Sequence, residues 1–449
     1  METFLIRALQ LVMALSMLVI IHEGGHFLFA KLFKVRVEKF YLFFDPWFSL
    51  FKFKPKNSET EYGVGWLPLG GYVKIAGMVD ESQNAEDLNH PVEPWEFRAK
   101  PAWQRLFIMI GGVLMNFLLA LFLYSMILFT WGDSYVPLQS MEHGMKFNER
   151  AKEIGFQDGD ILLRADDKAF TRYGVDMLRD ITEADFVFVK RNGEEVAIDI
   201  PEDLSLLTIG NDATPFIDML IPAVVDSVLA DYPATQAGIL QGDTLLAVNN
   251  RKVNDFVEFT SRIAALRARS DSITAEEKVA ALRNITLVVG RPSGRDTLSV
   301  QLDKDFKLGV QPALYEPLQV EYGFLASFPA GIQHGLNVLK GYVSDMKYVF
   351  TKEGASSLGG FGTIGSIFPA TWDWQRFWEM TAFLSIILAF MNILPIPALD
   401  GGHVLFLLYE VITRRKPSDK FMERAQMTGM LILFALLIWA NFNDLLRFL

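Results

Sequence analysis

The segment LVIIHEGGHFLFAKLF, residues 18–33, places two histidines and a glutamate inside an apolar stretch that otherwise reads as a membrane span. Ionisable side chains are costly in hydrocarbon and mark functional sites there. On a helix, His22 and His26 share one face about 6 Å apart, so both imidazoles can bind one metal ion. Glu23 lies beside that face and can act as the base for water in a metalloprotease. The segment therefore predicts a metal centre; the alternative is a hydrogen-bonded polar cluster inside a helical bundle.

Apolar and charged residues are separated along this chain of 449 residues, of which 51% are hydrophobic and 21% are charged. Apolar runs lie toward both ends, and a mixed polar stretch fills the middle. The runs lie near residues 4–31, 106–131, 377–407 and 427–446. Each can cross a hydrocarbon core of roughly 30 Å as a helix. The predicted fold class is an α-helical membrane protein with four transmembrane helices and a large polar insert.

The charged and sulfur-containing residues limit the possible ligands and partners. The chain contains no cysteine, so disulfides and cysteine-ligated zinc are excluded, and a metal must bind His, Asp or Glu. The formal charge of −11 lies in residues 132–376, which hold 35 Asp plus Glu and 24 Lys plus Arg. Because an acidic insert repels phosphate groups, nucleic acid is not an expected partner.

Basic residues near the ends of the apolar runs predict the orientation in the membrane. Residues 31–105 contain eleven Lys and Arg, and residues 408–424 contain five. Such residues gather on the cytoplasmic side, so both loops are expected to be cytoplasmic and both termini external. In a bacterial inner membrane the polar insert would lie in the periplasm, with the histidines toward the cytoplasmic side.

Residues 324–350 form a further apolar segment, which polar residues interrupt. Phe328, Ile332, Leu336 and Val343 recur at helical spacing, as in a helix that lies on a membrane surface or on another domain. A fifth span would also place the termini on opposite sides. We therefore expect an amphipathic interfacial region over residues 313–376.

The polar insert contains an internal repeat. AKEIGFQDGDILL (151–163) and ATQAGILQGDTLL (234–246) share one pattern, and each copy is followed by β-rich runs around a short turn. The repeated Gly-Asp pair is expected only to form a turn. The two strand-rich modules resemble tandem PDZ domains of bacterial membrane proteases. They are expected over residues 132–221 and 222–312.

The first cytoplasmic loop contains EYGVGWLPLGGYVKIAGM, residues 61–78. β-Branched and aromatic residues lie on either side of Pro68 and a Gly-Gly pair, which predicts a β-hairpin. The segment is apolar for a loop, so we expect it to enter the membrane or to line a cavity beside the spans.

A third metal ligand is predicted in FMNILPIPALDGGHVLFLL, residues 390–408. Prolines and glycines break this run around Asp400, and a broken backbone at membrane depth is tolerated only inside protein or beside a wet cavity. Counted from the outer ends of their runs, His22 and Asp400 lie at similar depth, so both can reach one ion. His403 is the alternative ligand, and Asp400 is preferred because it lies within the break.

Two asparagines lie in the predicted spans. Asn392 can either form a helix-packing hydrogen bond or donate to the substrate backbone and the developing oxyanion. Gly112 and Asn116, one turn apart in the second run, are expected to mark close helix packing.

HEGGH in the first run, NILPIPALDGG in the third and the paired modules together resemble the site-two protease family of intramembrane zinc metalloproteases. The resemblance covers essentially the whole chain. It implies that His22, His26 and Asp400 bind Zn²⁺ and that Glu23 is the catalytic glutamate.

The same resemblance implies two groups of substrate-binding residues. One lies in the third run, and the other lies in the membrane-associated hairpin of residues 61–78. They are Asn392, Pro395 and Pro397 in the run, and Gly70, Gly71 and Tyr72 in the hairpin.

The resemblance also implies a role in stress response through cleavage of single-span membrane proteins. The expected substrates are an anti-sigma factor, after a first protease has removed its external domain, and remnant signal peptides. Two alternative functions are also considered: a catalytically silent PDZ-bearing scaffold and a metal-ion transporter. The scaffold leaves Glu23 and Asp400 without a role, and the transporter leaves Glu23 and the paired modules without one.

Overall fold

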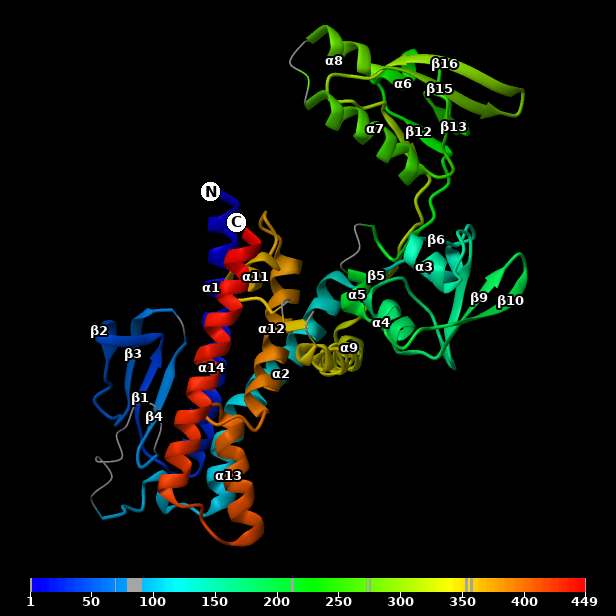
Figure 1. The fold of residues 1–449 in the computed structure, drawn as a ribbon. Coiled ribbons are helices and arrows are strands. Elements are labelled where there is room, and N and C mark those ends of the chain that lie inside the picture. The colour runs from blue at the N-terminus through cyan, green and yellow to red at the C-terminus, as the bar shows by residue number, and fades with distance from the viewer. Residues whose placement is uncertain are drawn as a thin grey trace. The chain divides into compact units, whose positions relative to one another are not determined.

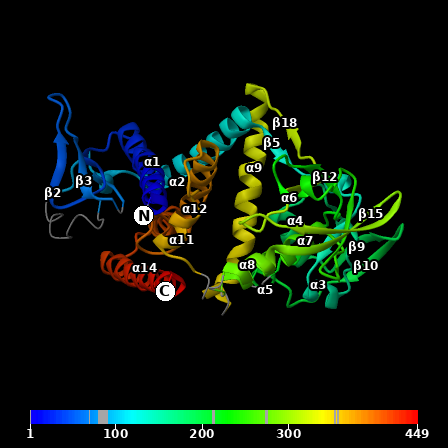
Figure 2. The ribbon, with the colours of Figure 1, turned by 90° about the horizontal axis from the view of Figure 1, so that it is seen from above.

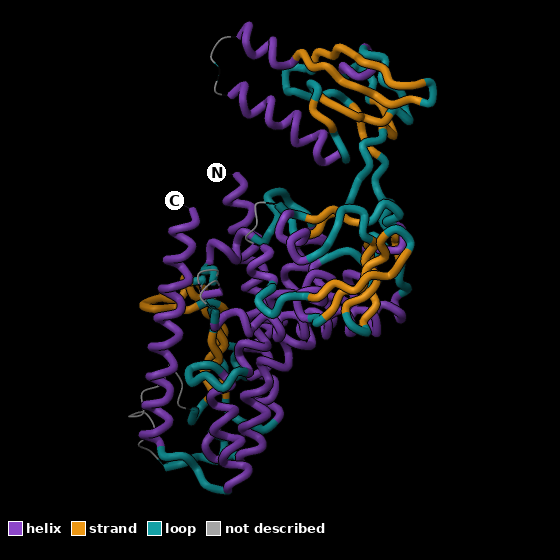
Figure 3. Tube along the Cα trace, turned by 45° about the vertical axis from the view of Figure 1, so that its right-hand side comes forward, coloured by secondary structure: helices purple, strands orange, loops and turns teal. Residues whose placement is uncertain are grey.

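The chain divides into two compact units, in which helices dominate unit 1 and strands gather mainly in unit 2 (Figures 1 and 3). Unit 1 contains Met1–Asp133 and Val320–Leu449, and unit 2 contains Ser134–Gln319. The computed structural model describes residues 2–68, 70–78, 91–210, 214–271, 273, 276–351, 354–355 and 358–448.

Unit 1 is built mainly from long apolar helices. Those long and apolar enough to cross a membrane, among the described residues, are α1, α2, α12 and the Lys420–Arg447 part of α14, in agreement with the four predicted spans. Both termini lie at the same end of this unit (Figures 1 and 3), as an even number of crossings requires. The helices are α1 (Glu2–Leu32), α2 (Ala102–Trp131), α9 (Phe324–Asp345), α11 (Phe361–Ser366), α12 (Trp374–Ile393), α13 (Asp400–Thr413) and α14 (Asp419–Phe448).

Helices α1 and α2 touch backbone to backbone at a pair of glycines. A β-carbon added to Gly25 would collide with the carbonyl oxygen of Gly111. Membrane helices commonly use small residues in this way, because they let two backbones approach. The contact is one residue from His26, so it fixes the height and rotation of the predicted metal-binding face of α1.

The third apolar run is broken as predicted. Helix α12 ends at Ile393, and α13 begins at Asp400 after a loop in which Ala398 has a φ of 81°. The glycine after Asp400 allows this geometry, because a β-carbon at Gly401 would collide with the Leu394 carbonyl oxygen. The break therefore places Asp400 at the first turn of a new helix, where the helix dipole favours a negative charge.

Helix α9 forms where the amphipathic segment was predicted, but the side that it buries differs from the predicted apolar side. It packs on α2 through small residues, since a β-carbon at Gly331 would collide with Ser125. The predicted apolar side chains are partly exposed: Ile332 by 40%, Leu336 by 42% and Val343 by 45%. Glycines bring the helix closer to α2 than large side chains could, and the apolar side is left free. Its contact with a membrane surface stays a prediction.

A four-stranded sheet beside α1 replaces the predicted hairpin of residues 61–78. In Figure 2 it lies on the other side of α1 from α9. Its strands are β1 (Val37–Leu42), β2 (Phe44–Phe53), β3 (Glu61–Leu67) and β4 (Tyr72–Ile75), in the order β2-β3-β1-β4. The hairpin prediction was wrong because β1 lies between β3 and β4, parallel to β3 and antiparallel to β4. Val37 and Tyr41 of β1 are buried, and their burial favours the central position.

Unit 2 contains two modules with the same strand order. The four-stranded sheets have the orders β10-β9-β7-β8 and β14-β13-β15-β16, which are equivalent when one is read backwards. Each sheet has its own buried core, one from Leu138 to Ile217 and the other from Ala223 to Leu308. The two predicted copies are therefore two similar folded modules, and their PDZ identity stays a prediction.

The elements of unit 2 are short. In the first module and its entry they are β5 (Asp133–Tyr135), β6 (Met145–Phe147), α3 (Glu149–Ile154), β7 (Ile161–Ala165), β8 (Lys168–Ala169), α4 (Val175–Glu183), β9 (Phe186–Arg191), β10 (Glu194–Asp199), α5 (Leu206–Gly210) and β11 (Ile217–Met219). In the second module and its exit they are β12 (Val225–Val228), α6 (Pro233–Gln236), β13 (Thr244–Val248), β14 (Arg251–Lys252), α7 (Phe256–Asp271), α8 (Glu276–Arg283), β15 (Asn284–Arg291), β16 (Gly294–Gln301), β17 (Val310–Pro312) and β18 (Leu318–Val320).

The Gly-Asp pairs of the repeat form turns and also hold a buried ion pair. Asp160 and Asp243 are 1% and 3% exposed, and each accepts hydrogen bonds from an arginine of its module's hairpin. Arg191 Nε lies 2.7 Å from Asp160 Oδ1, and Arg291 Nε lies 2.8 Å from Asp243 Oδ1. The hydrogen bonds from Arg291 hold the pKa of Asp243 below its ordinary value. The ion pair therefore fastens the hairpin to the turn in both modules.

Candidate metal centre

Three side chains that could hold a metal ion converge in unit 1. Asp400 Oδ2 lies 3.1 Å from His22 Nε2 and 3.4 Å from His26 Nε2. The two histidine Nε2 atoms lie 3.3 Å apart, and one donor atom from each residue lies within 4.8 Å of the others. Helix α1 supplies both histidines from successive turns, and the break before α13 supplies the carboxylate. The structure thus brings His26 and Asp400 together, although they are 374 positions apart in the sequence.

The backbone of α2 orients one of the two histidines. His26 Nδ1 lies 2.8 Å from the carbonyl oxygen of Ile108. A carbonyl can only accept, so Nδ1 carries a proton, and Nε2 is the ring nitrogen that faces Asp400. Metal-binding histidines are commonly held by a second hydrogen bond of this kind.

The donor set fits a zinc ion. Asp400 Oδ2 is buried, and Nε2 of both histidines lies within 3.4 Å of it. Two imidazole nitrogens and a carboxylate oxygen that face one another present lone pairs without enough protons between them. A divalent cation satisfies all three, and two histidines with one carboxylate are a known catalytic ligand set for zinc that leaves a position for water.

Glu23 lies beside the three donors without being one of them. Its carboxylate accepts a hydrogen bond from the Val73 backbone of β4. Glu23 follows His22 directly, so its side chain leaves α1 at an angle to the face that carries the two histidines. Glu23 is therefore outside the group of three residues that could hold a metal ion.

His403 is placed away from the cluster, although it was the alternative ligand. Its Nε2 atom lies 2.8 Å from Nε2 of Gln426 in α14. The ring therefore contacts α14, and the group of three residues that could hold a metal ion contains Asp400 instead. One turn of α13 separates the two side chains and directs them to different neighbours.

Gly112 of α2 makes room for both imidazoles. A β-carbon added there would lie 2.5 Å from His26 Nε2 and 2.7 Å from His22 Cε1. The sequence predicted close helix packing at Gly112, and the packing partner is the pair of histidines. Asn116, one turn further along α2, is buried with no hydrogen-bond partner for its Oδ1 atom in the described parts of the chain.

The predicted substrate-binding residues of the third run lie close to Asp400 in the chain. Asn392 is in the last turn of α12, and Pro395 and Pro397 are in the loop before Asp400. Pro397 packs closely on α14, because a β-carbon at Gly429 would collide with its carbonyl oxygen. The loop is therefore held between α13 and α14.

The predicted substrate-binding residues of the first loop lie where β4 meets α1. A β-carbon at Gly71 would lie 2.7 Å from Val19 Cγ1, less than one turn from His22. The Tyr72 hydroxyl donates to Asp45 Oδ1 over 2.9 Å, and burial raises the pKa of Tyr72 above its ordinary value. Gly70 packs on the ring of Phe44. The start of β4 thus lies next to the helix turn that carries the histidines.

An apolar hollow of about 400 Å³ lies beside the same turn of α1. Gly24 opens onto it, since a β-carbon there would meet nothing within 4 Å. Its lining residues are apolar or aromatic: Ile20, Ile21, Gly24, Phe27, Leu28, Phe40, Tyr62 and Met115. A hollow with this lining suits an apolar chain and offers no further acid or base.

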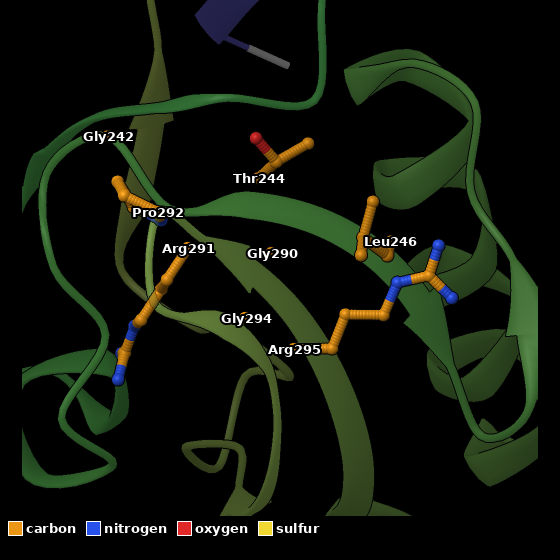
Figure 4. A pocket seen from close by; sticks show the side chains of 8 residues that line it. All are labelled: Gly242, Thr244, Leu246, Gly290, Arg291, Pro292, Gly294 and Arg295. Atoms are coloured by element: carbon orange, nitrogen blue, oxygen red, sulfur yellow. The ribbon is translucent and has the colours of Figure 1, made fainter.

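A second hollow, of about 490 Å³, lies in the second module of unit 2 (Figure 4). It is lined by Gly242, Thr244, Leu246, Gly290, Arg291, Pro292, Gly294 and Arg295. Arg291 is held by Asp243, so its guanidinium is already neutralised. The lining contains no carboxylate and no histidine.

Comparison with known proteins places these features in a family. The chain matches the model of Peptidase family M50 over residues 10–436. A Caulobacter vibrioides protein named Metalloprotease MmpA is 26% identical over 462 residues, which cover 99% of this chain and 96% of the relative. A Haemophilus influenzae protein named Regulator of sigma E protease is 25% identical over 485 residues, covering 97% and 98%. A Vibrio cholerae protein with the provisional name zinc metalloprotease is 26% identical over 459 residues, covering 97% of each chain.

The protein belongs to Peptidase family M50, because that family model matches nearly the whole chain. It is accordingly a zinc metalloprotease, as its relatives' names describe them. The convergence of two histidines and an aspartate gives this class a structural basis.

Sequence reasoning missed the parts of the site that α2 contributes. The Ile108 carbonyl is a backbone group and leaves no sequence signal. A largely buried ion pair between Arg105 of α2 and Glu410 of α13 was also missed. Its signal was present, since each residue is a charge within or next to an apolar run, where charges need a partner.

Proposed function

We propose that this zinc metalloprotease cleaves peptide bonds within the transmembrane segments of single-span membrane proteins. The observation that carries the proposal is the position of the donor cluster. His22 and His26 lie within a helix long enough to span a membrane, and Asp400 lies at the break of another apolar run. A protease of soluble substrates has no need for a centre at that depth.

The side chains have separate roles in the proposed hydrolysis. His22, His26 and Asp400 would hold the zinc ion, which when bound polarises the scissile carbonyl and makes water more acidic. Glu23 takes a proton from the attacking water and transfers it to the nitrogen of the leaving amine. The Ile108 carbonyl keeps the proton of His26 on Nδ1 during these steps.

The substrate must unwind before it reaches the centre, because a helix hides its own carbonyl groups. Strand β4 pairs only with β1 among the described strands, so its other edge has no strand partner there and could take up an extended chain. This edge begins at Gly70, Gly71 and Tyr72, against α1. The apolar hollow beside Gly24 would receive side chains of the unwound segment.

Residues of the broken third run would hold the scissile bond. The Asn392 amide would donate a hydrogen bond to the peptide oxygen as negative charge develops on it. Pro395 and Pro397 lack backbone N–H groups and cannot continue a helix, so they keep this segment non-helical between α12 and α13. The proximity of Asn392 to Asp400 in the chain supports this assignment.

The regulatory part of the proposal concerns unit 2. An anti-sigma factor already trimmed by a first protease is the expected substrate, together with remnant signal peptides, and a relative named Regulator of sigma E protease supports this choice. We place the modules in the periplasm of a bacterial inner membrane and the metal centre toward the cytoplasm. The modules would act as PDZ domains, either binding the new C-terminus or excluding substrates with a bulky external domain.

The central test replaces Glu23 with Gln in the full-length protein. A single-span model substrate is incubated with the purified variant, and zinc content is measured in the same sample. Zinc should stay stoichiometric while cleavage falls by roughly 10²- to 10⁴-fold, the usual contribution of a general base. Full activity of the variant would refute the role of Glu23.

A second test separates the two roles of unit 2. Residues 134–310 are deleted, and trimmed and untrimmed substrates are compared. A size filter predicts that the untrimmed substrate is now cleaved, and a required receptor predicts that cleavage of the trimmed substrate is lost.

The two rival functions give different results in simple assays. A silent scaffold would contain no stoichiometric zinc. A transporter would move metal ions into proteoliposomes, whereas the protease would not.

A further inference from the structure

Helix α2 contributes no metal ligand, but it contacts the elements that supply all three. Ile108 holds the His26 ring, and Gly112 borders both imidazoles. Arg105, three residues before Ile108, forms an ion pair with Glu410 of α13, the helix that begins with Asp400. Residues 105, 108 and 112 lie on one face of α2 by helical spacing. The segments that carry the proposed ligands, from the two ends of the chain, therefore pack on the same face of α2.

We propose that Arg105 and Glu410 are positioning residues for the metal centre: their ion pair fixes α13 against α2 so that the Asp400 carboxylate meets the two histidines. The inference rests on the proposed function only in requiring that Asp400 is a metal ligand. It adds residues that touch neither the metal nor the substrate.

The ion pair is well defined and largely buried. Arg105 Nη2 lies 2.5 Å from Glu410 Oε1, and the two side chains are 10% and 15% exposed. Arg105 is also fixed on its own side, because its Nε donates to the carbonyl oxygen of Lys100 over 3.0 Å. The guanidinium lies over the ring of Phe97 at 6.0 Å from its centre. The arginine therefore offers Glu410 a fixed docking point.

The face of α13 between Asp400 and Glu410 is packed on α2 along its length. Val404 and Leu407 are 6% and 7% exposed and share a core cluster with Ile108 and Met109 of α2. Asp400 and these two residues follow one another at intervals of four and three, and Glu410 continues the stripe after three more. Apolar packing resists separation of the two helices but allows sliding, whereas the ion pair at the end of the stripe fixes one register.

Loss of one partner should act on the metal through this register. A buried charge without its partner is strongly unfavourable, so α13 would shift to hydrate it. Glu410 lies about 15 Å from Asp400 along the helix, and a rigid helix carries a shift at one end to the other. Groups outside the ligand set that orient ligands typically change metal affinity by roughly 10- to 100-fold. Because this pair acts through the whole of α13, about tenfold is expected.

The test compares Glu410→Gln, Arg105→Gln and the charge exchange R105E/E410R in the full-length, detergent-purified protein. Zinc affinity is measured by competition with a chelator, Co²⁺ replaces zinc for a ligand-field spectrum, and far-UV circular dichroism reports helicity. Each single variant should bind zinc about tenfold more weakly and show an altered Co²⁺ spectrum, and the exchange should restore both. Arg376→Gln is the matched control, since it breaks the exposed Arg376–Glu379 pair of α12 and should change neither readout.

Each outcome decides one proposal. Single variants with unchanged zinc affinity and Co²⁺ spectrum overturn the positioning role while leaving the zinc site intact. If the single variants lose helicity, the exchange variant decides: normal helicity with weak zinc binding overturns the inference, and recovered binding supports it. Absence of zinc from the unaltered protein would contradict the proposed function instead.

Discussion

Gly112 lies directly against His26: a β-carbon on Gly112 would be 2.5 Å from His26 Nε2. Replacing Gly112 with Ala should push the imidazole away from Asp400, so zinc affinity should fall by roughly 10- to 100-fold and proteolysis with it. Chelator competition on the purified protein checks the expectation. Gly24→Ala is the matched control, because its added methyl group meets nothing within 4 Å. Equal loss of affinity in both variants would count against a specific contact with His26.

Removal of the metal should lower the thermal stability of the protein. Without a cation, the Asp400 carboxylate and the two imidazole nitrogens lose the group that satisfies them. A ligand at 100 times its dissociation constant stabilises a folded protein by about 2.7 kcal/mol, so a clear rise in melting temperature on adding zinc to chelated protein is expected. The melting temperature of Asp400→Ala should respond much less, and an equal response would indicate a different zinc site.

Replacement of Asp243 by Asn should loosen the second module of unit 2 without affecting the metal. The variant removes the buried negative charge that pairs with Arg291 and one of the two oxygens that accept from it, so amides of β15 and β16 should exchange with solvent roughly tenfold faster. Hydrogen exchange measured by mass spectrometry on the full chain resolves these strands. Asp296→Asn is the control, since Asp296 contacts the same arginine at an exposed position. Equal acceleration by the two variants would show that burial of Asp243 is unimportant.

The same ion pair predicts a pH dependence in that module. Arg291 holds the pKa of Asp243 below the ordinary value of 3.8, so the folded state favours the ionised carboxylate more than the unfolded state does. The stabilisation is therefore fully present above pH 3.8 and is lost as the pH falls through the lower folded-state pKa. Exchange protection of β15 and β16 should decline over that acidic range and should decline less in Asp243→Asn.

Replacement of Gly331 by Ala should separate α9 from α2. The added methyl group would collide with the Ser125 backbone, and overpacking of this kind costs about 1–3 kcal/mol. A lower melting temperature is expected, with the zinc content unchanged. Gly323→Ala, just before α9, has open space around the added group and should behave like the unaltered protein. A normal melting temperature for Gly331→Ala would contradict the close packing of these two helices.

Part of this architecture could be read from the sequence because its signals are local. Runs of apolar residues give the four candidate spans, and the prolines and glycines around Asp400 give the break. The spacing of His22, Glu23 and His26 indicates a metal-binding helix face without any knowledge of tertiary contacts. The repeat in unit 2 is likewise a local pattern, and the two sheets have equivalent strand orders.

The features that were missed depend on contacts between distant residues. Strand β1 separates β3 from β4, and no turn signal can indicate that a third strand enters between two neighbours in the chain. The bond between His26 and the Ile108 carbonyl joins positions 82 apart, and the pair of Arg105 and Glu410 joins positions 305 apart. A charged residue in an apolar run indicates that it has a partner, but only the packing of α13 on α2 identifies that partner.

The division of the ligand set between α1 and the break before α13 has a consequence for biosynthesis. His26 is made early, and Asp400 follows it 374 residues later. A nascent chain that has produced the two imidazoles and Glu23 still lacks the carboxylate that completes the cluster. If the proposed ligand set is right, hydrolysis therefore requires that Asp400 has been synthesised and has packed beside α1.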